Sequence, residues 1–272
     1  MKKGVIISGV GILVLAYACA TNPFTGEKTM ALVPDSQIFP MAFQEYNQFL
    51  NTNKVIKGTT EAKKVETIGT KIKTAAERWL TANGNPTYLK DYAWEYNLVD
   101  SKEVNAWCMP GGKIVVYTGI LPITKDDAGL AAVMGHEVAH ALANHGQQRM
   151  SAGLLQQAGG AAVAVATSNK SAQQQQEFMQ YYGLASQVGG MLPFSRSHEN
   201  EADKIGLLLM AIAGYEPQNA VAVWERMSAK AGGQAPPEFL STHPSNETRI
   251  KNLSAMIPQV KEEAKKFGVA FK

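Results

Sequence analysis

The 272-residue chain has only two cysteines, Cys19 and Cys108. If Cys19 is modified, Cys108 has no partner within the chain, so a disulfide framework of the kind that stabilises small secreted domains is excluded. We interpret Cys108 as a small buried hydrophobic residue. Stability must then come from a hydrophobic core, and a chain of this length with 45% hydrophobic residues can build one globular domain.

The chain also lacks a strong excess of either charge, with 26 Lys and Arg against 23 Asp and Glu and a net charge of +3. Removal of an N-terminal segment that contains Lys2 and Lys3 would lower the net charge to +1 (3 − 2). A nearly neutral body gives no electrostatic reason to bind nucleic acid. We therefore expect no nucleic-acid partner.

Long hydrophobic runs are missing except at the N-terminus, where residues 4–18, "GVIISGVGILVLAYA", follow the basic start "MKK". A membrane-spanning helix needs about 20 apolar residues, so this run suits the core of a signal peptide. Ala18 and Cys19 follow as in a bacterial lipoprotein signal, although Ala16 stands where such signals usually carry leucine. The alternative is a signal anchor that stays in the membrane.

These features predict three segments of the chain. Residues 1–18 form a signal peptide of the lipoprotein type, 19–34 form a linker from a lipidated Cys19, and 35–272 form a single domain. The protein is thus expected to be exported to a bacterial cell envelope and attached by its lipid. Ala20 after the cysteine permits sorting to the outer membrane, facing the periplasm.

The hydrophobic pattern of the body predicts a mostly helical α+β fold. Five apolar residues recur at helical spacing in one segment, namely Val65, Ile68, Ile72, Ala76 and Trp79. The runs "YAWEYNLV" and "KIVVY" are strand-like and predict a small antiparallel sheet. Residues 151–190 are rich in Ala, Gly and Gln, and we interpret them as a helical insertion that could fold over a neighbouring cleft as a plug.

Histidine is scarce, and two of the five histidines lie in "GHEVAH", residues 135–140. Residues i and i+4 of a helix share one face, so His136 and His140 can bind the same metal ion. Glu137 is displaced round the helix by one residue and can reach a water at that metal as a general base. The spacing predicts a zinc hydrolase site, against the alternative of two solvated histidines on one helix.

Zinc in a catalytic site takes a third protein ligand and keeps a position open. The candidates lie downstream, at His145, His198, Glu199, Glu201, Asp203 and His243. Within "SRSHENEADKIG", Glu199 and Asp203 are four residues apart on one helix face, and Glu201 is on the other side. One carboxylate can bind the metal while another orients a histidine, but the spacing alone does not choose between Glu199 and Glu201.

Four separated motifs occur in a fixed order: "NAWCMPGGKIVVYTGIL", "GHEVAHALANH", "PFSRSHENEADKIG" and "THPSNETRI". Together they resemble the zinc metallopeptidase family of the CAAX prenyl endopeptidase, the protease HtpX and the mitochondrial inner-membrane quality-control proteases. The resemblance spans about residues 94–253 and is strongest to exported lipoprotein members. It implies a zincin-like domain with an active-site helix carrying HExxH and a second ligand-bearing helix.

The resemblance also implies roles for individual residues. One Zn²⁺ per chain would be held by His136, His140 and Glu199, with Glu137 as the general base. Around them would lie Asp203 as the supporting carboxylate, His243 beside the metal, and Arg249 in a structural or oxyanion-side role. Glu201 would lie outside the shell, and His145 and His198 would be flanking residues, His145 with a possible part in supporting a ligand. His243 would stabilise the tetrahedral intermediate or temporarily fill the open position.

The implied function is zinc-dependent endopeptidase action on misfolded or misassembled envelope proteins. We expect Lys113, Ile114, Val115, Val116 and Tyr117 to form a sheet edge onto which an extended substrate adds as a strand, unless they form an ordinary core strand. Two other functions fit less well: a normally latent zinc protein with a chaperone-like or scaffolding role, and a lipoprotein adaptor without metal. Membrane contact would come from the N-terminal lipid.

Overall fold

The computed structural model describes residues 19–231, 243 and 247–271. The predicted signal peptide, 1–18, lies outside the described residues and stays a prediction. Among the described residues, no helix has both the length and the apolar character needed to cross a bilayer.

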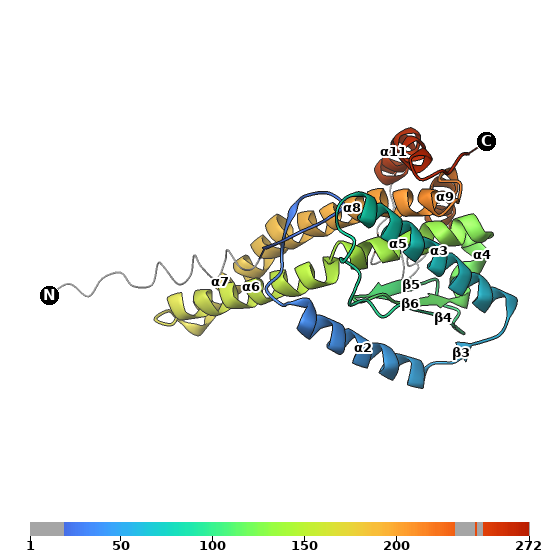
Figure 1. The fold of residues 1–272 in the computed structure, drawn as a ribbon. Coiled ribbons are helices and arrows are strands. Elements are labelled where there is room, and N and C mark those ends of the chain that lie inside the picture. Colours follow the sequence, from blue (N-terminus) through green and yellow to red (C-terminus); the bar gives the residue numbers. More distant parts are fainter. Residues whose placement is uncertain (1–18, 232–242, 244–246, 272) are drawn as a thin grey trace.

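A helical layer and a small sheet make up the body (Figure 1). The helix α5 (Asp127–Leu142) lies at the centre and packs against α3 (Thr60–Ala82), α8 (Leu192–Ile212) and α9 (Gln218–Ala231). The helix α11 (Glu247–Lys265) covers α8 and α9. The mostly helical α+β class is therefore confirmed.

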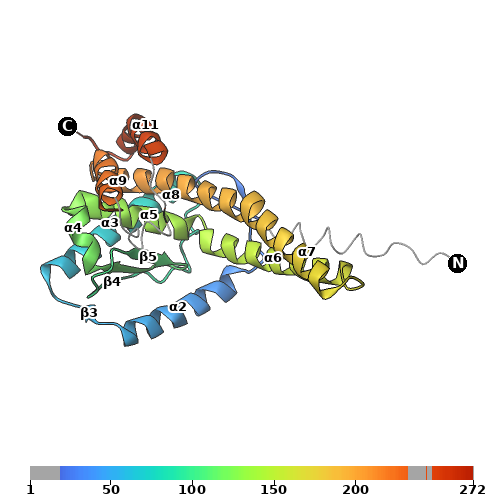
Figure 2. The same cartoon turned by 180° about the vertical axis from the view of Figure 1, so that it is seen from behind.

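The sheet lies between α5 and α2 (Asp35–Thr52), so the helices cover both of its faces (Figures 1 and 2). Its strands are β3 (Val55–Ile56), β4 (Glu95–Val99), β5 (Ala106–Met109) and β6 (Lys113–Tyr117). Their order is β3-β4-β6-β5, and the outer pairs are antiparallel. The sheet is nevertheless mixed, because β4 pairs with β6 in parallel.

The parallel pairing follows from the hairpin that joins β5 to β6. Gly111 and Gly112 have φ angles of +81° and +86°, which glycine adopts without strain. A Cβ at these positions would also meet the rings of Phe43 and Trp94. The hairpin folds β6 back between β5 and β4, so β6 runs in the same direction as β4.

The expected edge role of β6 is wrong. Its residues pair with β4 on one side and β5 on the other, and four of the five, Ile114 to Tyr117, are buried. A central strand has no free row of backbone groups to offer a substrate. Among the described strands, the outer strand of the sheet beside α5 is β5.

The helix α5 begins and ends at defined residues. A short 3₁₀ turn, η1 (Thr118–Ile120), and α4 (Leu121–Thr124) lead into it. The Asp126 side chain accepts the Gly129 N–H at 2.8 Å and caps the first turn. At the other end Asn144 is left-handed, with a φ of 57°, and turns the chain directly into α6 (His145–Ala166).

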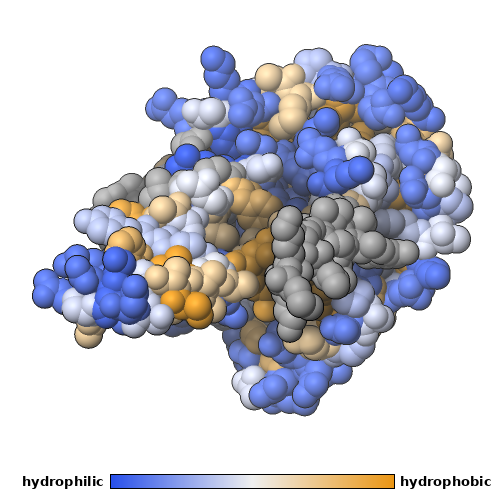
Figure 3. Space-filling view, turned by 90° about the vertical axis from the view of Figure 1, so that its left-hand side faces the viewer, coloured by the Kyte–Doolittle hydropathy of each residue, from blue (hydrophilic) through white to orange (hydrophobic). Residues whose placement is uncertain are grey.

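The Ala-, Gly- and Gln-rich insertion is helical, as predicted. The helices α6 and α7 (Ala172–Ser186) pair and continue through the π-helical turn η2 (Gln187–Met191) into α8. They form an arm that extends away from the body rather than across α5, so the described part of the insertion does not plug the site (Figures 1 and 2). Figure 3, which faces the arm, shows hydrophobic side chains gathered on it; the exposed ones include Leu154, Leu155, Val165, Tyr181 and Leu184.

The segment expected as a linker, 19–34, carries more structure than predicted. The strands β1 (Cys19–Thr21) and β2 (Lys28–Met30) form an antiparallel hairpin. Asn22 and Thr25, in the hairpin loop, bond to Glu201 of α8, and Leu32 N–H bonds to Ser151 of α6. Side-chain pairing with residues far along the chain orders this segment, which local periodicity does not reveal. The division into linker and domain stays a prediction.

Candidate metal centre

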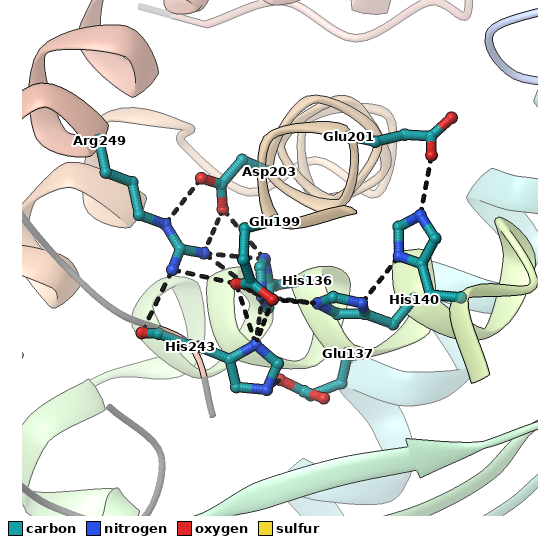
Figure 4. Close-up of polar contacts among 9 residues, drawn as sticks. His136, Glu137, His140, Glu199, Glu201, Asp203, His243 and Arg249 are labelled. Atoms are coloured by element: carbon teal, nitrogen blue, oxygen red, sulfur yellow. Dashed lines mark hydrogen bonds and ion pairs between the residues drawn. The ribbon is translucent and has the colours of Figure 1, made fainter. Parts of the chain in front are cut away.

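Four side chains converge beside α5. His136 and His140 come from α5, Glu199 from α8, and His243 from the segment between α9 and α11, of which the structure describes this residue alone. Each offers one ligand atom, and these atoms all lie within 4.8 Å of one another (Figure 4). The three predicted ligands are thus brought together, with His243 as a fourth donor.

Glu199 is the carboxylate of the cluster. Its oxygens lie 3.4 Å from His136 Nε2, 3.3 Å from His140 Nε2 and 3.0 Å from His243 Nδ1. Burial alone would raise the pKa of Glu199, but its hydrogen bonds with these three rings outweigh burial and hold that pKa well below its usual range. The structure therefore selects Glu199 over Glu201 as the carboxylate that faces the cluster.

A second carboxylate orients His136. Asp203 Oδ1 lies 3.0 Å from His136 Nδ1, so Nδ1 carries the proton and Nε2 keeps its lone pair for a metal. Arg249 donates two hydrogen bonds to Asp203, at 2.7 and 2.6 Å. Burial would raise the pKa of Asp203, but Arg249 and His136 lower it, so Asp203 stays ionised.

Arg249 has a structural role. Besides Asp203, its Nη1 lies 3.2 Å from Glu199 and 3.4 Å from the backbone oxygen of His243. Its guanidinium stacks on Trp224 at 3.6 Å from the ring centroid. One buried cation thus holds the residues that approach the cluster from α8 and from the His243 segment.

His140 is held by His145, for which the sequence left open a supporting role, and through it by Glu201, which the sequence placed outside the site. His145 Nδ1 lies 2.8 Å from His140 Nδ1, and His145 Nε2 lies 2.8 Å from Glu201 Oε2. Glu201 lies outside the ligand cluster, as expected, but it is joined to His140 through His145. The available signal was the third histidine of "HEVAHALANH", which the turn at Asn144 brings back onto the site.

His198 is not a ligand. Its ring stacks on His145, with centroids 4.0 Å apart, and its Nε2 bonds to Gln148 Oε1 at 3.1 Å. Burial, with the nearby His145 and Arg149, lowers the pKa of His198 to about 3. His198 is therefore a neutral packing residue behind His145.

Glu137 points toward the cluster from the strand side. It is buried, and its Oε1 makes no hydrogen bond within the described residues, lying 3.5 Å from His243 Nε2. Burial raises the pKa of Glu137, although His243 and His136 oppose the shift. A buried carboxylate with an unused oxygen beside a metal-binding cluster can accept a proton from a water bound there.

Two cavities adjoin the cluster. One, of about 370 Å³, lies between α8 and α11 and reaches Glu199 and Arg249. The other, of about 190 Å³, lies between β5 and the end of α5 and is lined by Cys108, Met109 and His140. Cys108 is half-buried here rather than fully buried, and burial raises the pKa of its thiol.

Known proteins share this region of the chain. The model of peptidase family M48 matches residues 69–257, which include both ligand-bearing helices. The chain is 38% identical over 179 residues to "Mitochondrial metalloendopeptidase OMA1" of Schizosaccharomyces pombe, covering 64% of this chain and 50% of that protein. It is 40% identical over 183 residues to the protein of the same name in Arabidopsis thaliana, covering 67% and 35%.

A bacterial relative is more distant. The chain is 27% identical over 189 residues to "Beta-barrel assembly-enhancing protease" of Escherichia coli, covering 65% of this chain and 38% of that protein. The chain thus spans half or less of the length of these three relatives. The matched segment covers more than half of the chain and carries the whole donor cluster. The chain therefore belongs to peptidase family M48, a family of metallopeptidases.

Proposed function

We propose that this protein is a zinc-dependent endopeptidase with one Zn²⁺ per chain. The observation that carries the proposal is the buried cluster of His136, His140, Glu199 and His243, with Glu137 beside it. Imidazole and carboxylate donors converging on one point are those that zinc uses in catalytic sites. Zinc, when bound, would polarise the scissile carbonyl and lower the pKa of the attacking water.

The residues around the cluster would take the other roles in hydrolysis: proton transfer, stabilisation of the oxyanion and orientation of a ligand. Glu137 would take the proton from the attacking water at Oε1, which makes no hydrogen bond within the described residues, and later pass it to the leaving amine. His243, whose Nε2 lies 3.5 Å from Glu137, would donate a hydrogen bond to the developing oxyanion. Asp203 would keep His136 in the tautomer that leaves Nε2 free.

His243 also supports the second candidate, a latent zinc protein with a chaperone-like or scaffolding role. Its Nδ1 lies 3.2 Å from His136 Nε2 and 3.0 Å from Glu199, close enough to serve as a fourth ligand. A zinc ion with four protein ligands has no open position for water or substrate. Activity would then require that His243 move away.

For the substrate, we propose that β5 replaces β6 as the binding edge. Tyr117 N–H bonds to the Asn105 oxygen, and an antiparallel ladder alternates, so the backbone groups of Ala106 and Cys108 point away from β6. An extended peptide could pair with the Ala106 oxygen and with the Cys108 backbone close to α5, whereas the Ala106 N–H already bonds to the Asn105 side chain at 2.9 Å. A structure with a bound peptide inhibitor should place its backbone against Ala106 and Cys108, and pairing elsewhere would refute this edge.

The cellular setting is a further part of the proposal. The basic start, the apolar run and the Ala18–Cys19 junction support export and a lipid on Cys19, on the periplasmic side of a bacterial outer membrane. Misfolded or misassembled envelope proteins are the substrates we propose. Mass spectrometry of the N-terminal peptide from the cell-expressed protein should find a lipidated Cys19, and an unprocessed Met1 would contradict this part.

The activity is tested with an unfolded reporter such as reduced, alkylated lactalbumin. The purified chain should contain about one zinc, lose cleavage on chelation and regain it with zinc. His243→Ala separates the two candidates: faster cleavage indicates a blocking ligand, and slower cleavage with zinc retained indicates oxyanion stabilisation. Absence of both zinc and cleavage in both chains would refute the proposed function.

A further inference from the structure

We infer that Glu201 is a positioning residue for His140, and that the N-terminal hairpin holds Glu201 in place. The inference rests on the proposed zinc site and adds to it a support outside the family's HExxH helix. It makes the segment that directly follows Cys19 a structural part of the metal centre.

The direction of the hydrogen bonds follows from the donor atoms. His140 turns Nε2 to the cluster, 3.1 Å from His136 Nε2, so that nitrogen must keep its lone pair for a metal. A neutral His140 then carries its proton on Nδ1 and donates it to His145 Nδ1, 2.8 Å away. His145 must therefore carry its own proton on Nε2, and it donates to Glu201 Oε2 at 2.8 Å.

Each of these two hydrogen bonds allows only one tautomer of the histidine that takes part in it. If His145 were protonated on Nδ1 instead, its hydrogen would oppose the one on His140. Glu201 as a carboxylate can only accept, so it selects the Nε2–H form of His145.

The hairpin fixes the carboxylate from the other side. Asn22 Nδ2 donates to Glu201 Oε1 at 2.6 Å, and Thr25 Oγ1 donates to the same oxygen at 2.9 Å. Asn22 is 3% exposed and His145 is 0% exposed, so water has little access to replace these bonds. His136 and His140 are thus each tied to a carboxylate, His136 directly to Asp203 and His140 through His145 to Glu201.

Zinc affinity and histidine tautomers test the inference in the full chain. Glu201→Met removes the acceptor at similar size and should weaken zinc binding by roughly 10- to 100-fold, the usual cost of losing an orienting partner. Long-range ¹H–¹⁵N spectra of the zinc-free protein should show His140 as the Nδ1–H tautomer in wild type and as a mixture in Glu201→Met. Glu201→Gln keeps one acceptor and should lie between the two.

Thr25→Val tests the hairpin, because it removes one donor to Glu201 at similar size, together with a longer, exposed bond of 3.4 Å that the hydroxyl accepts from Glu27 N–H. Thr29→Val is the matched control, since the Thr29 hydroxyl bonds to Ala20 O within the hairpin, at 3.2 Å, and to no other residue that the structure describes. Thr25→Val should weaken zinc binding about threefold, and Thr29→Val should leave it unchanged. Asn22 is left intact because its Oδ1 also accepts the Phe24 N–H and shapes the turn.

The inference is overturned if Glu201→Met binds zinc as tightly as the wild type and shows the wild-type tautomer of His140. Equal effects of Thr25→Val and Thr29→Val on zinc affinity would also overturn it. Failure of the proposed function gives a different result, because the wild-type chain would then neither bind zinc nor cleave the reporter.

Discussion

At the scale of single residues, the two histidines of α5 differ in how they are oriented. His136 bonds directly to Asp203, which Arg249 anchors, whereas His140 reaches Glu201 only through His145. The first arrangement could be anticipated from the four-residue spacing of Glu199 and Asp203 on one helix. The second could not, because it depends on the turn at Asn144 and on Asn22 and Thr25, which lie more than 170 positions before Glu201 in the chain.

A pH-dependent loss of stability is expected from His198. Its pKa is lowered to about 3 by burial and by nearby His145 and Arg149, whereas an unfolded histidine titrates near 6.5. The unfolded chain therefore binds a proton more readily than the folded one below pH 6.5. The stability that neutral His198 contributes is complete above pH 6.5 and is lost as the pH falls from 6.5 toward 3.

His198→Phe keeps a ring against His145 and removes the titration. Urea unfolding of both chains, with chelator present, is compared at pH 7.5 and 5.5. Between these pH values the free energy of unfolding of the wild type should fall by about 1.4 kcal/mol more than that of the variant, since one extra proton is bound on unfolding below pH 6.5. Equal losses in the two chains would mean that His198 does not remain neutral in the fold.

At the scale of elements, the crossing of α5 and α8 sets the geometry of the metal centre. The two helices touch backbone to backbone at Gly135 and Gly206, where a Cβ on Gly206 would lie 2.7 Å from His136 N. The crossing lies next to His136 on α5 and one turn beyond Asp203 on α8. A larger residue there would separate the ligands of one helix from those of the other.

Gly206→Ala should therefore destabilise the fold by about 1–3 kcal/mol, because the opposing atoms are backbone and cannot rotate away. Zinc affinity should fall as Glu199 moves from the histidines. Gly153→Ala in α6 is the control, since its Cβ would meet nothing within 4 Å and alanine is favoured in helices by about 1 kcal/mol. Urea unfolding that ranked the two substitutions equally would contradict the close crossing.

Some elements could be predicted from local sequence patterns, and others could not. Helical spacing identified α3, α5 and α8, because that pattern is local. It could not place β6 in the sheet centre, since strand order depends on how the Pro110–Gly112 turn folds the hairpin onto β4. The sequence predicts a linker over 19–34, because the contacts that hold the β1–β2 hairpin against α6 and α8 join residues far apart in the chain.

At the scale of the whole molecule, the site joins three distant parts of the chain: the α5–α8 crossing, the His243 and Arg249 region, and the N-terminal hairpin. The arm of α6 and α7 extends away from it (Figure 1). The two histidine ligands of α5 were predictable because they share a helical turn, whereas Glu199 was predictable only from the resemblance to the metallopeptidase family. The contacts of the N-terminal hairpin with Glu201 could be seen only in the folded chain.

The proposed function rests most heavily on Glu137 as the general base of peptide hydrolysis at a zinc site. Glu137→Gln is introduced into whichever of the wild-type and His243→Ala chains cleaves the unfolded reporter faster, and zinc content and cleavage rate are measured on the same sample. We expect about one zinc per chain and a cleavage rate at least about 100-fold lower, because the general base is lost while the ligands remain. Cleavage at the parent rate by the zinc-loaded variant would refute this role of Glu137.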